Sequence, residues 1–174
     1  MPYPKTYDEA PVAVNMDLLG DDFPYATTAL QGKHALVCGA SKGIGRATAQ
    51  MMAKAGANVT VCARNADSLK ALCEELTELG PGKHTAMTLD LENQEAISEQ
   101  IPALLKQQGP VHILINNAAG PPGGPLLANT LEDFEAPFKR HLHAAHTLTQ
   151  LIAPGMEQEG YGRIIQIIST SVKE

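Results

Sequence analysis

Three glycines at positions 39, 43 and 45 are the residues of this 174-residue chain whose spacing most clearly predicts chemistry. A short apolar run, His34 to Cys38, precedes them, and a helix-forming segment follows. Gly39 can take backbone angles that a Cβ forbids, Gly43 leaves room for a pyrophosphate, and Gly45 lets a helix pack close to a strand. The first amides of that helix then face the anion, together with the positive end of the helix dipole. The stretch therefore predicts a strand–turn–helix unit that binds the phosphates of a dinucleotide.

The residues after the second expected strand indicate which dinucleotide is bound. A site for NAD carries a carboxylate about 20 residues past the glycines, where it holds the ribose hydroxyls. Here that strand ends at Cys62, and Arg64 follows with no acid beside it. An arginine fork binds a 2′-phosphate, and Lys42 adds a second positive charge, so the pair favours NADP(H) over NAD(H). Asp90, after the third strand, could accept a hydrogen bond from the adenine amino group or simply form a turn.

Strands and helices alternate along the chain from Lys33 onward. Strand patterns occupy residues 34–38, 58–62, 84–89, 111–115 and 163–168, and helical periodicity occupies 43–55, 67–79, 93–108 and 131–157. Helices between strands require crossover connections and hence a parallel sheet. Right-handed crossovers give a three-layer α/β/α, doubly wound sheet (Rossmann) with strand order 3-2-1-4-5. The ligand should lie above the carboxyl ends of strands one and four, where residues 39–45 and 116–120 fall.

Some side chains within these elements carry more detailed expectations. The first helix should turn its larger apolar positions toward the core, namely Ile44, Ala47, Thr48, Met51 and Met52. The last helix contains Pro137 and Pro154, and either could kink it. Cys38 and Cys62 fall in expected strands and are most simply core residues.

The composition excludes several classes of function. Hydrophobic residues make up 44% of the chain and charged residues 18%, which is typical of a globular protein. The net charge is −6 with no basic run, so nucleic acid is not an expected partner. Residues 1–14 lack the apolar segment of a signal peptide, and no apolar run is long enough for a membrane helix. The three cysteines are odd in number, which fits a reducing cytoplasm.

The chain divides into an N-terminal segment and one domain. Residues 1–30 contain four prolines, at positions 2, 4, 11 and 24, and show no sustained periodicity. We interpret this segment as an arm or linker that a neighbouring subunit could order. Residues 31–174 are expected to form a single NADP-binding Rossmann domain, and the protein is expected to be a homo-oligomer, either dimer or tetramer.

The histidines near the end of the chain look like a metal-ligand cluster but do not fit one. His141, His143 and His146 lie on an expected helix, where residues two apart point to different sides. Only His143 and His146 share a face, and Asp21-Asp22 fits a solvated turn better than a metal site. We therefore expect no metal.

Four segments of this sequence resemble the short-chain dehydrogenases/reductases. Residues 38–45 resemble the Thr-Gly-x-x-x-Gly-x-Gly motif of that family, with Cys38 in place of the threonine. Asn116-Asn-Ala-Ala-Gly120 is similar to the Asn-Asn-Ala-Gly segment after strand four, and Asp90-Leu91 to the adenine contact after strand three. Residues 162–169 resemble the strand that leads to the catalytic serine. The resemblance extends from about residue 32 to the C-terminus.

The resemblance implies hydride transfer between a nicotinamide and a small-molecule carbonyl or alcohol substrate. Ser169 matches the serine that holds the substrate oxygen, and His141 stands where the family has an asparagine that supports a proton relay; a histidine can carry a proton near neutral pH. The dinucleotide contacts carried over from the family motifs and the charge argument are Gly39, Ser41, Lys42, Gly43, Ile44, Gly45, Arg64, Asp90, Leu91, Asn117, Ala118 and Ala119.

One part of the family pattern is missing from these residues. The acid–base tyrosine and lysine should follow the serine as Tyr-x-x-x-Lys, and this sequence ends at Glu174 without them. A strand over 163–168 rich in isoleucine would also be an exposed sheet edge. We therefore expect these residues to be the N-terminal portion of a longer polypeptide, with the C-terminal strands and helices of the fold beyond Glu174.

Two other functions are compatible with the sequence. The histidine at 141 in place of asparagine is also expected of a catalytically silent NADP-binding module that acts as a sensor or assembly partner. The loop Asn-Asn-Ala-Ala-Gly-Pro also suits an enoyl-type reductase, which reduces a C=C bond.

Overall fold

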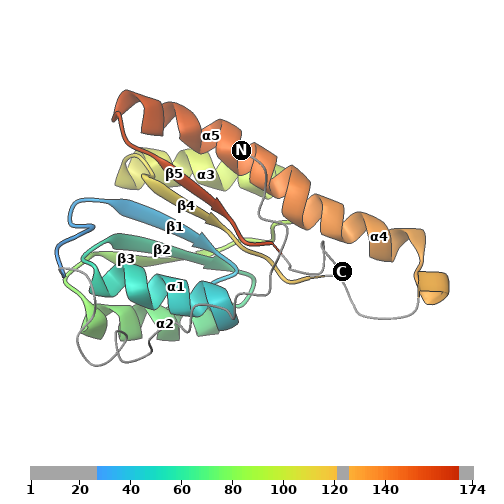
Figure 1. The fold of residues 1–174 in the computed structure, drawn as a ribbon, viewed down its shortest axis with the longest axis horizontal. Helices are drawn as coiled ribbons and strands as arrows, with labels where there is room; N and C mark the ends of the chain where they lie inside the picture. Colours follow the sequence, from blue (N-terminus) through green and yellow to red (C-terminus); the bar gives the residue numbers. More distant parts are fainter. Residues whose placement is uncertain (1–26, 121–125, 169–174) are drawn as a thin grey trace, which may run out of the picture.

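Five parallel strands form the centre of the molecule (Figure 1), in the computed structural model that describes residues 27–120 and 126–168. The strands are β1 (His34–Cys38), β2 (Asn58–Ala63), β3 (His84–Thr88), β4 (Ile113–Asn116) and β5 (Arg163–Gln166). Their order across the sheet is β3-β2-β1-β4-β5, and every neighbouring pair is parallel. The order predicted from the sequence is therefore confirmed, although β3 and β5 end sooner than expected.

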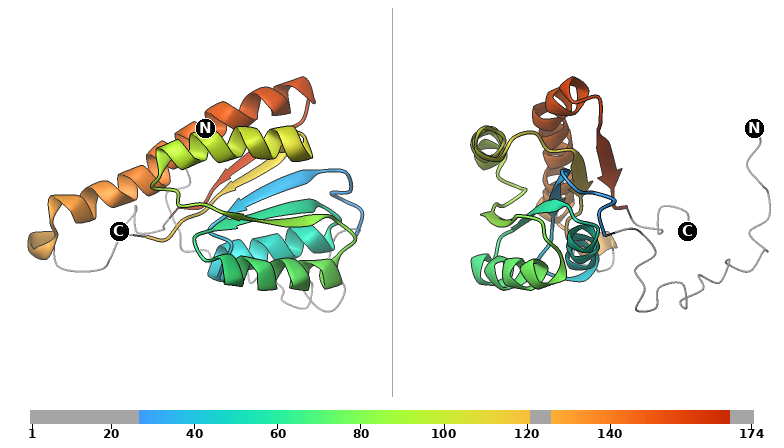
Figure 2. Two further views of the ribbon diagram at one scale, coloured as in Figure 1. Left: turned by 180° about the vertical axis from the view of Figure 1, so that it is seen from behind. Right: turned by 90° about the vertical axis from the view of Figure 1, so that its left-hand side faces the viewer.

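Helices cover both faces of the sheet and complete a three-layer fold (Figure 2). In chain order the helical elements are α1 (Gly43–Lys54), α2 (Ala66–Leu79), α3 (Gln94–Gln108), η2 (Leu126–Ala128), α4 (Leu131–Pro137), η3 (Phe138–His143) and α5 (Ala144–Gln158). The helices α1 and α2 lie on one face, while α3 and α5 lie on the other (Figure 2). None of the helices in the two described ranges is sufficiently long and apolar to cross a lipid bilayer.

Each face of the sheet has its own hydrophobic core. Leu114 of β4 packs with Leu148 of α5 on one side, and Val59 of β2 packs with Leu72 of α2 on the other. All five residues of β1 are buried, as expected of a central strand that is covered on both faces. These two cores fix the carboxyl ends of the strands, where the loops begin.

Helix α1 presents small residues to the sheet rather than the larger ones predicted. Its buried positions are Gly45, Ala49 and Ala53, whereas the side chains of Ile44 and Met51 are 61% and 39% exposed. The predicted inward face was therefore wrong for Ile44 and Met51, whereas Met52 is partly buried and packs against the core. The helix approaches the sheet so closely at its first turn that only small side chains fit beneath it.

The helix expected over residues 131–157 is divided into three parts. The α-helical segment α4 ends at Pro137, a π-helical segment η3 follows, and α5 continues from Ala144. Proline lacks the N–H that an α-helix needs, and the change of hydrogen bonding begins directly after Pro137. Pro154 lies inside α5 without interrupting it. A π-helical segment of this kind often occurs at functional sites.

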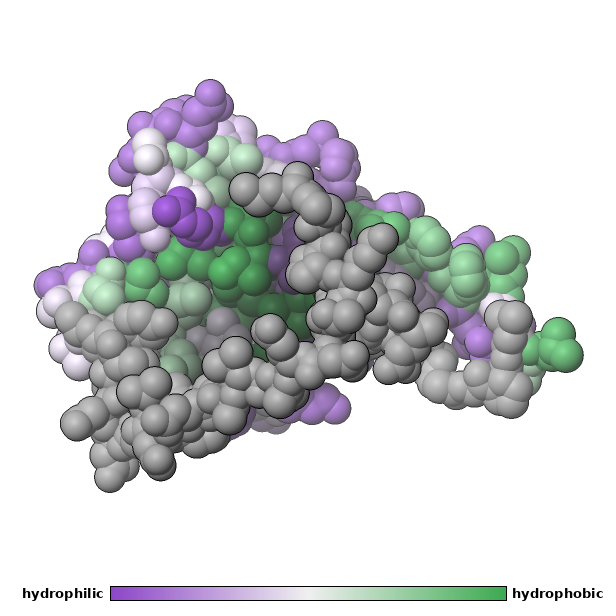
Figure 3. All heavy atoms as spheres, viewed as in Figure 1, coloured by the Kyte–Doolittle hydropathy of each residue, from purple (hydrophilic) through white to green (hydrophobic). Residues whose placement is uncertain are grey.

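Strand β5 forms one edge of the sheet in the described part of the chain, and it exposes apolar side chains. Ile164 and Ile165 of the strand are 38% and 42% exposed, and Ile168, two residues beyond it, is 77% exposed. Figure 3 shows this apolar surface over β5, and more of it along α4. The isoleucine-rich edge expected from the sequence is therefore observed.

Most of the N-terminal segment lies outside the described residues. Residues 27–30 form a turn, and the main-chain N–H of Leu30 donates to the carbonyl of Ala55 at 2.8 Å. The division at residue 30 stays a prediction.

Candidate functional site

A cavity of about 610 Å³ opens at the carboxyl ends of the strands β1 to β4. All the cofactor residues predicted from the sequence line it except Gly45: Gly39, Ser41, Lys42, Gly43, Ile44, Arg64, Asp90, Leu91, Asn117, Ala118 and Ala119. Segments that are up to 80 residues apart in the sequence thus meet at one place, as the rule for ligands above parallel strands requires. Whether these residues contact a dinucleotide stays a prediction.

The glycine turn between β1 and α1 has the backbone that only glycine adopts freely. Gly39 and Gly43 have φ angles of 60° and 58°. A Cβ on Gly39 would lie 2.6 Å from both the side-chain nitrogen and the main-chain oxygen of Asn117, whereas a Cβ on Gly43 would point into open space. Gly45 packs against the carbonyl of Gly39, with no room for a Cβ. Gly39 and Gly45 therefore permit close packing, and Gly43 leaves the cavity side open.

The N-terminus of α1 lacks the side-chain cap that the N-termini of α2 and α3 have. Asn65 caps α2 and Asn93 caps α3, each through a side-chain oxygen that accepts a main-chain N–H. Lys42 stands at the N-cap position of α1, and its side chain makes no capping hydrogen bond. Because Gly43 and Lys42 line the cavity, the free amides of this first turn lie at its wall.

Asn117 braces the glycine turn from the neighbouring strand. Its side-chain nitrogen donates to the carbonyl of Cys38 at 3.2 Å and to that of Gly39 at 3.3 Å. This contact fixes the loop after β4 to the loop after β1. The sequence assigned Asn117 to cofactor binding, and the structure adds this second task, which the residue spacing alone did not reveal.

The thiols beneath the turn belong to the core. Cys38 and Cys62 are paired in register on β1 and β2, and both side chains are fully buried. The hydrogen bond to Cys38, together with burial, raises the pKa of the Cys62 thiol. Both cysteines are therefore core residues, as predicted, and the raised pKa leaves little thiolate at Cys62.

The charged side chains around the cavity are mostly basic. Lys42, Arg64 and Arg140 line it, against the single carboxylate of Asp90. One oxygen of Asp90 accepts the main-chain N–H of Glu92 at 3.0 Å, so this residue forms a turn as well as part of the wall. The side chains of Lys42 and Arg64 make no hydrogen bond or ion pair with another described residue. These two cations are thus available to an anionic ligand.

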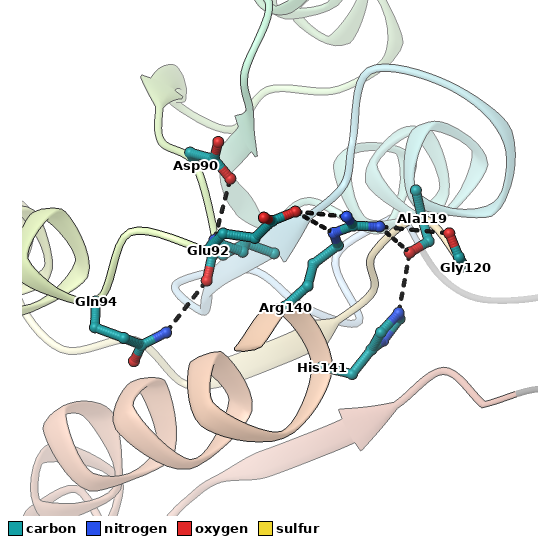
Figure 4. A network of polar contacts seen from close by, with 8 residues as sticks. Asp90, Glu92, Gln94, Ala119, Gly120, Arg140 and His141 are labelled. Carbon is teal, nitrogen blue, oxygen red and sulfur yellow. Dashed lines mark hydrogen bonds and ion pairs between the residues drawn. The ribbon is translucent and has the colours of Figure 1, made fainter. Parts of the chain in front are cut away.

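A polar network at the rim of the cavity was not foreseen from the sequence (Figure 4). Arg140 of η3 pairs with Glu92, which follows β3, at 2.5 Å, and donates to the carbonyl of Ala119 at 2.9 Å. His141 approaches the same carbonyl through Nε2 at 3.0 Å. The only signal in the sequence was that Glu92 and Arg140 carry opposite charges and each adjoins a residue already assigned to the site.

The similarity to known proteins now identifies the family. A sequence model described as short chain dehydrogenase matches residues 33–174. The chain belongs to this family. The 7alpha-hydroxysteroid dehydrogenase of Escherichia coli K12 is 35% identical over 145 residues, which cover 83% of this chain and 56% of that protein. The ketoacyl reductase HetN of Nostoc is 34% identical over 84% of this chain and 51% of its own length. The chain therefore spans about half the length of the curated relatives it matches.

Solved structures of other short-chain dehydrogenases have the same fold. The L-sorbose reductase of Gluconobacter frateurii, solved with NADPH and L-sorbose, is 27% identical with a TM-score of 0.79, over 85% of this chain and 56% of that one. A metagenomic short-chain oxidoreductase solved with NADP is 34% identical with a TM-score of 0.78, over 84% of this chain and 66% of that one. The Rossmann fold expected from the sequence is thus confirmed.

Two residues, Ser169 and His141, are expected to take part in the chemistry of a short-chain dehydrogenase, and the structure describes one of them. Ser169 lies outside the described residues. His141 is partly buried in the π-helical segment and lines a second cavity, of about 240 Å³, beside the first. Asn116 also lines this smaller cavity; the residue is 9% exposed, and its buried side-chain amide has no hydrogen-bond partner among the described residues.

Proposed function

We propose that this chain is the cofactor-binding part of an NADP(H)-dependent oxidoreductase, which transfers a hydride between nicotinamide and a small carbonyl or alcohol substrate. One observation carries the proposal: the cavity above the strands contains the glycine turn and two available cations, Lys42 and Arg64, with no acid at the end of β2. The NADPH and NADP in the solved L-sorbose reductase and metagenomic oxidoreductase support the same cofactor.

The residues present suit the parts of NADP(H). The open side of Gly43 and the uncapped amides of α1 suit the pyrophosphate, because both supply N–H groups without a competing side chain. Arg64 and Lys42 suit the 2′-phosphate, since a guanidinium forms paired hydrogen bonds to phosphate. The free carboxylate oxygen of Asp90 suits the adenine amino group. When bound, the nicotinamide supplies the hydride acceptor or donor, and the protein holds and orients it.

His141 and Ser169 are the residues that we assign to the substrate side. In one tautomer His141 donates from Nε2 to the carbonyl of Ala119, which leaves Nδ1 free to accept a proton. Ser169 would hold the substrate oxygen by a hydrogen bond. The substrate, a cytoplasmic location and assembly into a homo-oligomer stay predictions from the sequence.

The test is a fluorescence titration with NADPH and NADH, because the chain contains no tryptophan to absorb or emit beside the nicotinamide. Wild-type protein should bind NADPH more tightly than NADH. The substitution Arg64→Ala should weaken NADPH about tenfold, as expected for lost charge-assisted hydrogen bonds, and leave NADH unchanged. Lys106→Ala, which removes one positive charge from the last turn of α3, is the matched control. Equal affinity for both dinucleotides, unchanged by Arg64→Ala, would refute the assignment.

A second candidate function is a dinucleotide-binding module without catalysis. The observation that favours it is His141, which stands where short-chain dehydrogenases have an asparagine. Hydride transfer by the full-length protein, followed as NADPH absorbance with a panel of small ketones, separates the two. Turnover that depends on His141 supports the enzyme, and tight NADPH binding without turnover supports the silent module.

A further inference from the structure

Arg140 joins three parts of the chain that lie far apart in the sequence (Figure 4). Its Nε and Nη2 donate to Glu92 Oε1 at 2.8 and 2.5 Å, and its Nη1 donates to the carbonyls of Ala119 and Gly120 at 2.9 and 3.4 Å. The loop after β3, the loop after β4 and the π-helical segment η3 therefore meet at one guanidinium. Its side chain is only 19% exposed, so solvent weakens these contacts little.

The neighbouring contacts hold the same segments in place. His141 Nε2 lies 3.0 Å from the carbonyl of Ala119, which therefore has two side chains against it. On the side of β3, Thr147 of α5 donates to Gln94 at 2.9 Å and anchors the segment that carries Glu92. Successive side chains diverge less around a π-helix than around an α-helix, which lets Arg140 and His141 approach one carbonyl.

The guanidinium of Arg140 is occupied within the protein. Each of its three nitrogens donates to a protein oxygen, and the carboxylate of Glu92 balances its charge. Lys42 and Arg64, which line the same cavity, have no such partners among the residues described. Arg140 is thus suited to hold the cavity wall rather than to bind an anion itself.

We propose that Arg140 and Glu92 form a clasp that positions the loop after β4, residues 117–120, for the dinucleotide. The inference rests on the proposed function, because it assumes that the cavity takes NADP(H). The clasp acts on the loop and not on the 2′-phosphate. Its loss should therefore weaken NADPH and NADH by the same factor, unlike the loss of Arg64.

The experiment compares dissociation constants of the folded variants for NADPH and NADH. Arg140→Gln should weaken both dinucleotides about tenfold, since charge-assisted hydrogen bonds to the loop are lost. Arg140→Lys keeps the charge but not the planar fork, and should weaken both similarly. Glu92→Gln should weaken both about threefold, because a neutral amide holds the guanidinium less firmly.

The sign of the Glu92→Gln effect separates a clasp from a direct ligand. If Arg140 itself bound a phosphate, removing the carboxylate would release its charge and tighten binding. Tighter binding by Glu92→Gln, or full recovery of affinity with Arg140→Lys, would overturn the proposal. The matched control is Lys139→Gln, in the adjacent residue, whose one ion pair within the described part of the chain is an exposed one with Glu135 at 3.9 Å. Its affinities should equal those of the wild type.

Two further readouts distinguish positioning from a loss of folded protein. Irreversibly unfolded protein lowers the number of sites in the titration but leaves their dissociation constant unchanged. Hydrogen exchange of the peptide that covers residues 113–120, measured without ligand, should be faster in Arg140→Gln than in the wild type, and unaltered in Lys139→Gln. Unchanged exchange together with unchanged affinity would refute the clasp.

The outcomes also separate this inference from the proposed function. If wild-type protein binds neither dinucleotide, the proposed function fails. If it binds NADPH, and Arg140→Gln binds equally well, only the clasp fails. If Arg140→Gln loses NADPH affinity alone, Arg140 reads the 2′-phosphate and is a ligand rather than a clasp.

Discussion

The side chains of Lys42 and Arg64 and the first amides of α1 face the cavity at the carboxyl ends of the strands. They have no hydrogen-bond partner among the described residues. At the amino ends, polar groups are bonded to one another. His34 Nε2 lies 2.8 Å from Thr60 Oγ1, which lies 3.0 Å from Thr85 Oγ1, and Gln108 donates to Thr85 at 3.1 Å. The same sheet thus leaves two cations open at one end and joins hydroxyl, amide and imidazole groups at the other, although His34 Nδ1 and both ring nitrogens of His84 have no hydrogen-bond partner among the described residues.

The difference indicates what each end contributes. Lys42 and Arg64 are exposed and hydrated, so they cost the fold little stability and are available to pair with an anionic ligand. The hydrogen bonds among His34, Thr60, Thr85 and Gln108 instead stabilise the fold. Substitutions at the cavity end should therefore change binding, and substitutions at the opposite end should change stability alone.

The largest effect should come from Gly39→Ala at the cavity end. The φ of 60° is strained for alanine, and the new Cβ would lie 2.6 Å from atoms of Asn117. We expect the free energy of unfolding to fall by about 3 kcal/mol in urea denaturation, with loss of NADPH binding. Gly32→Ala is the control, because Gly32 has a φ of 77° but no atom near its would-be Cβ. That variant should lose about 1 kcal/mol and bind normally. Equal losses for the two glycines would contradict this account.

Acidic pH should lower the folding stability through the histidines at the amino ends of the strands. His112 Nδ1 accepts the main-chain N–H of His34 at 3.0 Å, which requires an unprotonated nitrogen. Burial, and to a lesser extent the charge of Lys33, lowers the pKa of His112, against a smaller opposing effect of Glu159. Burial also lowers the pKa of His34. The unfolded chain then binds more protons than the folded one, so stability is complete above about pH 6.5 and falls as the pH falls below it.

The variant that tests this is His112→Asn, whose amide oxygen can accept the same N–H without titrating. Wild-type unfolding free energy should drop by about 2 kcal/mol between about pH 7.5 and pH 5, and the drop should be smaller in His112→Asn. Burial also lowers the pKa of His84, so part of the drop should remain. His146→Asn, at an exposed position on α5, should follow the wild type. An identical pH profile for His112→Asn would exclude this role.

The parts of this division that could be predicted from the sequence are those encoded by short segments. Apolar runs and glycine turns determine the five strands, and right-handed crossovers then determine their order. The glycine spacing and Arg64 indicated the cavity and its ligand before any contact was known. Each of these features could be predicted from one short segment of the sequence.

The parts that could not be predicted depend on contacts between distant segments. The small inward face of α1 follows from how near Gly45 comes to the carbonyl of Gly39, whereas a periodicity argument favours the larger Ile44 and Met51. Arg140 pairs with Glu92 from the π-helical segment after Pro137, and no pattern in the sequence specified that segment. The bond between His112 and His34 spans 78 residues and likewise has no local signal.

The smallest effect, and the sharpest test of the division, is expected for Thr85→Val at the amino end. Valine has the shape of threonine and suits a strand, so the change removes little besides the hydroxyl. Gln108 and Thr60 then lose a partner, and the free energy of unfolding should fall by about 1 kcal/mol while NADPH affinity stays the same. Thr77→Val removes a hydroxyl whose one partner among residues 27–120 and 126–168 is the carbonyl of Cys73, on the exposed side of α2, and should change stability by less than about 0.5 kcal/mol. If Thr85→Val weakened NADPH binding instead, the two ends of the sheet would be energetically coupled, and the separation between a stabilising end and a binding end would not hold.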